Sequence, residues 1–253
     1  MRLDSTDVLI VGGGVVGCAT AYYLACRGVD TLLLERGALN RGASGANAGT
    51  LHIQIPAFHF RTQFLDNSAA GQPEPDSDFN ATNQLFAAAA DAWCRIEREL
   101  NADLGVRIVG GLMVAESERD MEVLEAKAAY ERRIGMQCEV LNRTEALRYE
   151  PCLGPSVVGA SYCPTEGFAN PLLAGPTFIR RAQSAGARLR LHTHVTEIEP
   201  ALGGAWQVET SSGPIRAQRI VVAAGAQTRQ VMGLLGLDLP ILPHPLQVMV
   251  TAP

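Results

Sequence analysis

The chain has 253 residues, of which 47% are hydrophobic, and its formal net charge is −5. This length allows a sizeable core and predicts more than one domain. The acidic balance argues against nucleic-acid binding, which needs a basic face, and no uncharged apolar run is long enough to predict a transmembrane helix.

The first predicted elements form a dinucleotide-binding fingerprint. An apolar run at 8–11 predicts a buried parallel strand, and Gly12, Gly14 and Gly17 follow it in G-x-G-x-x-G spacing. Gly12 allows a sharp turn, Gly14 allows the backbone to approach a pyrophosphate, and Gly17 allows the next helix to pack closely on the strand. An ordinary glycine turn would not explain the acidic residue that follows.

That acidic residue is Glu35, which ends a second apolar run at 31–34. In a dinucleotide fold an acid at this distance accepts hydrogen bonds from the adenosine ribose. The intervening helix begins near Val15 and Val16, and its first N–H groups are predicted to face the phosphates. These features predict a site for the AMP half of a dinucleotide.

The segment after Glu35 favours FAD over a nicotinamide cofactor. It reads RGALNRGASGANAGTLHIQIP, and its small residues allow the backbone to pass close to an extended ligand. Arg36 and Arg41 would add positive charge near a diphosphate, and Ser44, opening a short helix, could donate its hydroxyl to a phosphate oxygen. A flexible surface loop is the alternative explanation.

The pattern ER-x-x-x-x-R-G-A-S-G-A-N-A-G-T-L resembles the second motif of the FAD-dependent D-amino-acid oxidase superfamily, which includes glycine and sarcosine oxidases. Its NAGTLHIQ wording is most similar to the small flavin subunits of opine and D-hydroxyproline dehydrogenases. The resemblance covers nearly the whole chain. It implies contacts with the FAD cofactor in this segment by Ala43, Ser44, Ala48, Gly49, Thr50 and Leu51.

Two later segments extend the resemblance. In the stretch 167–200, Val195 would meet the adenine end of the cofactor, and Asn170 is predicted to cap a helix that begins at Pro171. The apolar strand RIVVAAGAQT is similar to a family motif that crosses near the cofactor, which implies contacts by Ala224 and Gly225.

Between these segments the sequence predicts a different pattern of loops, helices and strands. A loop is predicted at 66–78 and a helix at 83–100, and VRIVGGLMVAES reads as a hairpin about Gly110-Gly111. Ser117 with Asp120 should cap a charged helix that runs to Arg133. Further along, a capping box is expected from Asn142 and Glu145, a strand from VVGASYC, and another strand from LQVMVTA near the end of the chain.

These patterns predict an α/β fold: a Rossmann-like FAD-binding domain with an inserted mixed, partly antiparallel substrate domain. We expect the FAD-binding domain at 1–100 and 170–228, the first part of the inserted domain at 101–169, and the start of its second part at 229–253. Family members usually continue to a further flavin-contacting segment. The chain is therefore expected to be the N-terminal portion of a longer enzyme, with a naturally split subunit as the alternative.

The resemblance implies an FAD-dependent oxidoreductase that oxidises the C–N bond of an amino acid or secondary amine by hydride transfer to flavin N5. A flavin-holding subunit that needs partner chains and a nicotinamide-dependent dehydrogenase remain alternatives. His52 and Gln54 could line the substrate site, although buried strand positions explain them equally well. Tyr162 and His244 are weaker candidates, and no catalytic residue is assigned.

The cysteines and histidines predict no metal site. Neither a C-x-x-C pair nor metal-ligand histidine spacing occurs among the 6 cysteines and 5 histidines. His192 and His194 alternate along a predicted strand and should face the same side. The chain opens without the apolar region of a secretory signal peptide, so we expect a cytoplasmic protein.

Overall fold

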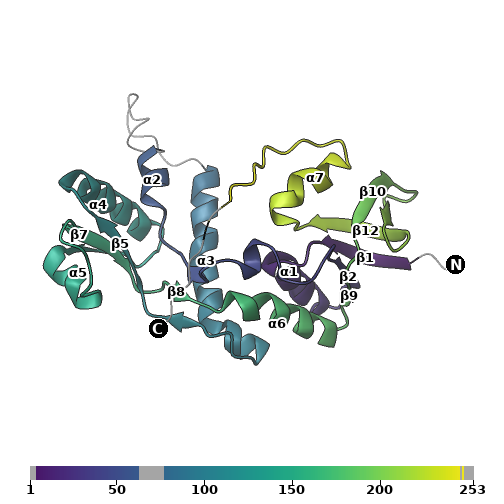
Figure 1. The fold of residues 1–253 in the computed structure, drawn as a ribbon, viewed down its shortest axis with the longest axis horizontal. Coiled ribbons are helices and arrows are strands. Elements are labelled where there is room, and N and C mark those ends of the chain that lie inside the picture. The colour runs from purple at the N-terminus through teal and green to yellow at the C-terminus, as the bar shows by residue number, and fades with distance from the viewer. Residues whose placement is uncertain (1–3, 63–76, 246, 248–253) are drawn as a thin grey trace. The chain divides into compact units, whose positions relative to one another are not determined.

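A computed structural model describes residues 4–62, 77–245 and 247 of the chain (Figure 1). The chain divides into two compact units. The first unit comprises Met1–Gly49 and Asn170–Pro253, and the second comprises Thr50–Ala169. The predicted α/β class, with a second domain inserted into the first, agrees with this division.

The unit boundaries differ from the predicted ones at two places. The second unit begins at Thr50 rather than near residue 101, because the helix α3 (Ser77–Leu100) contributes Ala90 to the core of that unit. The described residues from 229 onward belong to the first unit, because α7 (Thr228–Gly233) packs against β12 (Ile215–Val222) of its sheet.

The first unit is built on a six-stranded mixed sheet. β1 pairs in parallel with both β2 and β12, and β2 pairs in parallel with β9, whereas β10 and β11 run antiparallel to their neighbours. In spatial order the strands are β10 (Val195–Pro200), β11 (Trp206–Thr210), β12, β1 (Asp4–Val11), β2 (Thr31–Leu34) and β9 (Arg188–Arg190).

Apolar residues on the central strands form the core of this unit. Leu9, Leu32 and Ile215 are completely buried in one cluster, as expected for strands covered on both faces. Two helices, α1 (Val15–Ala25) and α6 (Pro171–Ser184), pack against each other. Asn170 caps α6 as predicted: its side chain accepts a hydrogen bond of 2.9 Å from the Leu172 N–H, with proline at the first helical position.

The second unit holds two three-stranded antiparallel sheets, β3-β8-β4 and β5-β7-β6. Its described helices are α2 (Ala57–Phe60), α3, α4 (Glu118–Arg133) and α5 (Arg143–Tyr149). The strands are β3 (Thr50–Leu51), β4 (Arg107–Ile108), β5 (Gly111–Ala115), β6 (Glu139–Asn142), β7 (Gly159–Cys163) and β8 (Gly167–Phe168).

Local capping signals predicted where α4 and α5 begin. The Ser117 side chain accepts a hydrogen bond from the Asp120 N–H at 3.2 Å, and α4 ends at Arg133 as expected. Asn142 and Glu145 form both bonds of the predicted capping box at the start of α5. VVGASYC contains β7, and α3 covers the predicted helix at 83–100 but begins earlier, at Ser77.

The predicted hairpin about Gly110-Gly111 is wrong. β4 ends at Ile108 and β5 begins at Gly111, but β4 pairs with β8 and β5 pairs with β7. Gly110 has a φ of +85°, and a side chain there would collide with Tyr162, since a Cβ atom would lie 2.3 Å from its ring. The glycines therefore carry the chain from one sheet to the other.

The predicted strand through His192 and His194 is also absent. Both residues lie in the connection between β9 and β10, and His192 has a φ of +51°, which an extended strand does not allow. The predicted strand at 246–252 falls mostly outside the described residues. So does the predicted loop at 66–78 as far as residue 76, and its last two residues are wrong as loop because they begin α3.

Candidate functional site

The predicted cofactor residues of the first unit gather at one edge of its sheet. The parallel strands β1, β2 and β12 end side by side, with Val11 opposite both Leu34 and Val222. Gly12 follows β1, Glu35 follows β2, and Ala223 to Gly225 follow β12. Ligands of open α/β sheets bind outside the carboxyl ends of the strands, so the fold makes this edge the candidate site.

Two of the fingerprint glycines are required by direct contacts. Gly12 has a φ of +118°, and a Cβ atom there would lie 2.3 Å from the carbonyl oxygen of Ala223. A Cβ atom at Gly17 would lie 2.0 Å from the carbonyl oxygen of Gly12. Any side chain at these positions would push α1 or β12 away from the turn after β1.

Ser44 lies at the N-terminus of α1. The N-cap of α1 is Gly14, which has no side chain to accept a bond from the first turn. Ser44, in the short helix η1 (Ala43–Gly45), supplies that acceptor, because its Oγ accepts a hydrogen bond of 3.0 Å from the Val15 N–H. A hydroxyl group has one proton to donate, so Ser44 can still bind a ligand oxygen at this helix end.

The helix end can also bind an anion through its backbone. Val16 is 65% exposed, and first-turn N–H groups such as those of Val16 and Gly17 have no acceptor within the helix itself. The partial positive charge at a helix N-terminus favours phosphate there. A Cβ atom at Gly14 would lie 3.0 Å from Ser44 Oγ. Because glycine lacks this atom, a phosphate has room to approach the helix end.

Glu35 connects the turn that follows β1 to the segment that follows β2. Its Oε2 accepts a hydrogen bond of 2.7 Å from the Gly13 N–H, and its Oε1 accepts one of 2.8 Å from the Gly37 N–H. A carboxylate has about four acceptor positions, so about two remain for the hydroxyl groups of a ribose. The ribose role of Glu35 stays a prediction, and its bonds to the backbone were not predicted from the sequence.

Two asparagines hold the segment from Arg36 to Gly49. The buried Asn40 has a φ of +60° and donates from Nδ2 to the Pro171 carbonyl at 2.8 Å. Asn47 donates to the carbonyl of Ser44 at 2.9 Å and accepts from the Gly49 N–H at 2.7 Å. These bonds fix the position of Ser44. The residue type could have indicated these bonds, because asparagine tolerates positive φ and forms local turns.

The other predicted contacts of the first unit lie in the segment after β2, at the start of β10 and just after β12. Arg36, Arg41 and Ala48 are exposed and available to a ligand. Val195 opens β10 just after Thr193, whose N–H bonds the Glu35 carbonyl at 3.0 Å. Ala224 precedes the short helix η3 (Gly225–Gln227), and Gly225 has a φ of +55°. Thr50 and Leu51 form β3 and belong to the second unit.

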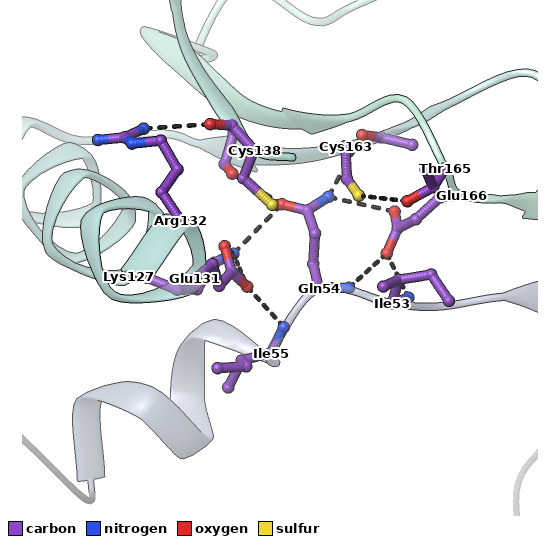
Figure 2. Close-up of polar contacts among 12 residues, drawn as sticks. Ile53, Gln54, Ile55, Lys127, Glu131, Arg132, Cys138, Cys163, Thr165 and Glu166 are labelled. Carbon is purple, nitrogen blue, oxygen red and sulfur yellow. Dashed lines mark hydrogen bonds and ion pairs between the residues drawn. The ribbon is translucent and has the colours of Figure 1, made fainter. Parts of the chain in front are cut away.

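The second unit contains a buried polar network around Gln54 (Figure 2). The Gln54 Oε1 accepts hydrogen bonds from Ser161 Oγ at 2.7 Å and from Lys127 Nζ at 3.2 Å. The Nε2 donates to Glu166 Oε2 at 3.1 Å and to the Gly111 carbonyl at 3.3 Å. Gln54 is only 5% exposed, and its amide is satisfied from within the protein. This supports a structural role for Gln54.

Two carboxylates of the same network hold the backbone after β3. Glu166 Oε1 accepts from the N–H groups of Ile53 at 2.7 Å and Gln54 at 2.8 Å, and Glu131 Oε1 accepts from Ile55 at 2.7 Å. Lys127 bonds both oxygens of Glu131 at 2.8 Å, and both side chains of this pair are fully buried. The sequence did not single out Lys127, Glu131 or Glu166, although four-residue spacing on a helix was a signal for the first pair.

The remaining substrate-site candidates have different surroundings. Tyr162 stacks on Tyr149 with ring centroids 4.2 Å apart, and burial raises the pKa of its hydroxyl group. His52 and His244 are exposed.

Within the described ranges, no group of three His, Cys, Asp or Glu residues could hold a metal ion, and no helix is long and apolar enough to cross a membrane.

The chain is similar to known proteins in both sequence and fold. Residues 7–253 match the family model DAO, described as FAD dependent oxidoreductase. Over 249 residues the chain is 30% identical to an opine oxidase subunit of Rhizobium meliloti, and the match covers 97% of this chain and 63% of that protein.

Two solved structures have a similar fold. Glycine oxidase from Geobacillus kaustophilus is 28% identical with a TM-score of 0.77, and the match covers 93% of this chain and 60% of that one. L-α-Glycerophosphate oxidase from Mycoplasma pneumoniae, solved with FAD bound, is 26% identical with a TM-score of 0.76, and the match covers 92% of this chain and 57% of that one. The chain thus spans about three fifths of the length of each of these three proteins.

Proposed function

The chain belongs to the DAO family of FAD dependent oxidoreductases, and from that membership we propose that its first unit binds the ADP half of FAD. The predicted resemblance to this family is confirmed. The observation that carries the binding proposal is the grouping of Ser44, Glu35 and the N-terminus of α1 at the carboxyl edge of the sheet.

Each group at this edge has a chemical partner in FAD. The Ser44 hydroxyl and the first N–H groups of α1 would bind the diphosphate, while the exposed Arg36 and Arg41 would add positive charge near it. The spare acceptor positions of Glu35 suit the ribose hydroxyl groups. The backbone at Val195 would contact the adenine. Ala224 and Gly225 would contact the cofactor just beyond the end of β12.

We further propose oxidation of a C–N bond in an amino acid or a secondary amine. When bound, FAD would accept a hydride from the substrate carbon. The oxidised substrate is then an imine, which water hydrolyses. The protein's task is then to position the substrate and exclude water. The support is that similar proteins are named as a glycine oxidase and as part of an opine oxidase.

A flavin-holding subunit that works only with partner chains is the second candidate. The observation in its favour is the similarity to a protein whose name marks it as one subunit of an oxidase. Both candidates require FAD at the same edge of the sheet. They differ in whether the chain oxidises an amine by itself.

The cofactor and the reaction are tested in sequence on the full purified chain. The visible spectrum is recorded, and the cofactor released by heating is identified by chromatography against FAD and NAD standards. We expect FAD, and release of NAD instead would contradict the binding proposal. Amino acids and secondary amines are then added without oxygen. Bleaching of the flavin supports amine oxidation by the chain itself, whereas retained FAD that no amine bleaches favours the second candidate.

A further inference from the structure

Two cysteines of the second unit lie at the same end of the paired strands β6 and β7. The antiparallel register of β6 and β7 pairs Glu139 with Tyr162 and Val140 with Ser161. One further step along this register sets Cys138, just before β6, opposite Cys163, the last residue of β7. Directly opposed antiparallel residues have Cα atoms about 4.5–5.5 Å apart, within the roughly 4.4–6.8 Å that a disulfide spans.

The two side chains also share one environment. Directly opposed residues point to the same face of a sheet, and Cys138 and Cys163 belong to one buried cluster with Ile53 and Ala128. Their exposed fractions are 2% and 0%. Both are free thiols in the described structure, and both lie next to the network around Gln54 (Figure 2).

We propose that Cys138 and Cys163 are a site of reversible oxidation, at which a peroxide converts the two thiols into a disulfide that joins β6 to β7. This inference does not depend on the proposed cofactor. The other described cysteines lack this arrangement, since Cys26, Cys94 and Cys152 are exposed and Cys18 lies in the first unit.

The thiols differ in a way that suits the reaction. Hydrogen bonds from the Cys138 thiol and the Thr165 side chain lower the pKa of Cys163 to about 7, even though burial opposes this shift. The bond to Cys163, together with burial, raises the pKa of Cys138. A thiolate is the nucleophile in such chemistry, and the Thr165 hydroxyl group lies 3.3 Å from the Cys163 sulfur, where it can donate a hydrogen bond to a thiolate. We therefore assign Cys163 as the attacking residue and Cys138 as the residue that completes the bridge.

The steps balance with peroxide as the oxidant. The Cys163 thiolate attacks one oxygen of hydrogen peroxide, the O–O bond breaks, and hydroxide leaves with sulfenic acid formed on Cys163. Cys138 then attacks this sulfur, its proton passes to the departing hydroxide, and the S–S bond forms. Two thiols and one peroxide therefore give one disulfide and two molecules of water, and an added dithiol reverses the change.

The test uses the full chain treated with hydrogen peroxide, then unfolded in an alkylating reagent and digested. Mass spectrometry should find the Cys138 and Cys163 peptides joined, with a loss of about 2 Da for the two hydrogen atoms. Dithiothreitol should restore both thiols. The bridged protein should also unfold at a midpoint several degrees higher, because the bridge restricts the unfolded chain.

Two variants separate this bridge from other pairings. Cys152 is exposed and lies on the same tryptic peptide as Cys163, so Cys152→Ser is the matched control and should keep the bridge. Cys163→Ser should abolish it. If this variant fails to fold, the wild-type and Cys152→Ser digests still decide the question. The proposal is overturned if Cys138 and Cys163 stay separately alkylated after peroxide treatment, or if either pairs with Cys152.

Discussion

The Oγ of Ser44 accepts a hydrogen bond of 3.0 Å from the N–H of Val15, a residue 29 positions earlier in the chain. The glycine fingerprint leaves the start of α1 without a side-chain cap, because its N-cap is Gly14. Ser44 supplies the cap from a separate segment. One hydroxyl group thereby links the first glycine motif to the second small-residue motif at the place where a diphosphate is expected.

Replacing Ser44 with alanine should weaken both stability and cofactor binding. Loss of a helix cap costs about 1 kcal/mol, and loss of the donated hydroxyl bond should lower FAD affinity several-fold. Urea unfolding and flavin fluorescence titration measure the two effects. Ser184→Ala is the matched control, since Ser184 is exposed at the end of α6 and bonds only to the Arg180 carbonyl among its described contacts. Equal effects of both substitutions would contradict the assigned role.

A methyl group at residue 17 should separate α1 from the strand that precedes it. In Gly17→Ala the new Cβ would meet the Gly12 carbonyl oxygen at 2.0 Å, and such overpacking destabilises by about 1–3 kcal/mol. Gly154→Ala is the control, because a Cβ atom there has no neighbour within 4 Å. Denaturant midpoints compare the two variants, and an unchanged midpoint for Gly17→Ala would show that the close approach is not required.

Glu35→Gln tests whether the two carboxylate oxygens are both needed. A glutamine amide has one acceptor oxygen, so its NH₂ group must face either the Gly13 or the Gly37 N–H. Losing one hydrogen bond to a charged group should destabilise the chain by about 1.5–3 kcal/mol. We also expect FAD affinity to fall about tenfold, which corresponds to about 1.4 kcal/mol. An unchanged dissociation constant for FAD would remove Glu35 from the cofactor site.

Breaking the buried ion pair of α4 should destabilise the chain far more than breaking a surface pair. Lys127→Met leaves Glu131 charged and buried without its partner, a loss of about 3–5 kcal/mol. Adding Glu131→Gln removes that charge, keeps an acceptor for the Ile55 N–H and should recover part of the loss. Arg229→Met breaks the exposed pair with Asp238 and should cost about 0–1 kcal/mol. Thermal unfolding of the three variants checks this order.

Features decided by neighbouring residues were predictable from the sequence. The caps at Ser117, Asn142 and Asn170 each depend on a short polar side chain close to the N–H group that it accepts from. The strands before Gly12 and Glu35 were predictable because parallel strands covered on both faces are continuously apolar. These local rules also located the first motif of the candidate site.

Features decided by distant partners were not predictable in the same way. Gly110 and Gly111 suit a hairpin locally, but the partners of β4 and β5 come from 159–168. Lys127 and Glu131 have the spacing of an ordinary surface pair, and their burial depends on Gln54 and Ile55, more than 70 positions away along the chain. A one-dimensional pattern does not contain such pairings.

The most direct test of the central claim is the affinity of the full chain for FAD compared with FMN, measured by quenching of flavin fluorescence. FMN carries the flavin and one phosphate but lacks the adenosine half that the edge of the first unit is proposed to bind. We predict that FAD binds at least about 100-fold more tightly than FMN, a difference of about 2.7 kcal/mol. Equal affinities for the two flavins, or no binding of FAD, would contradict the account.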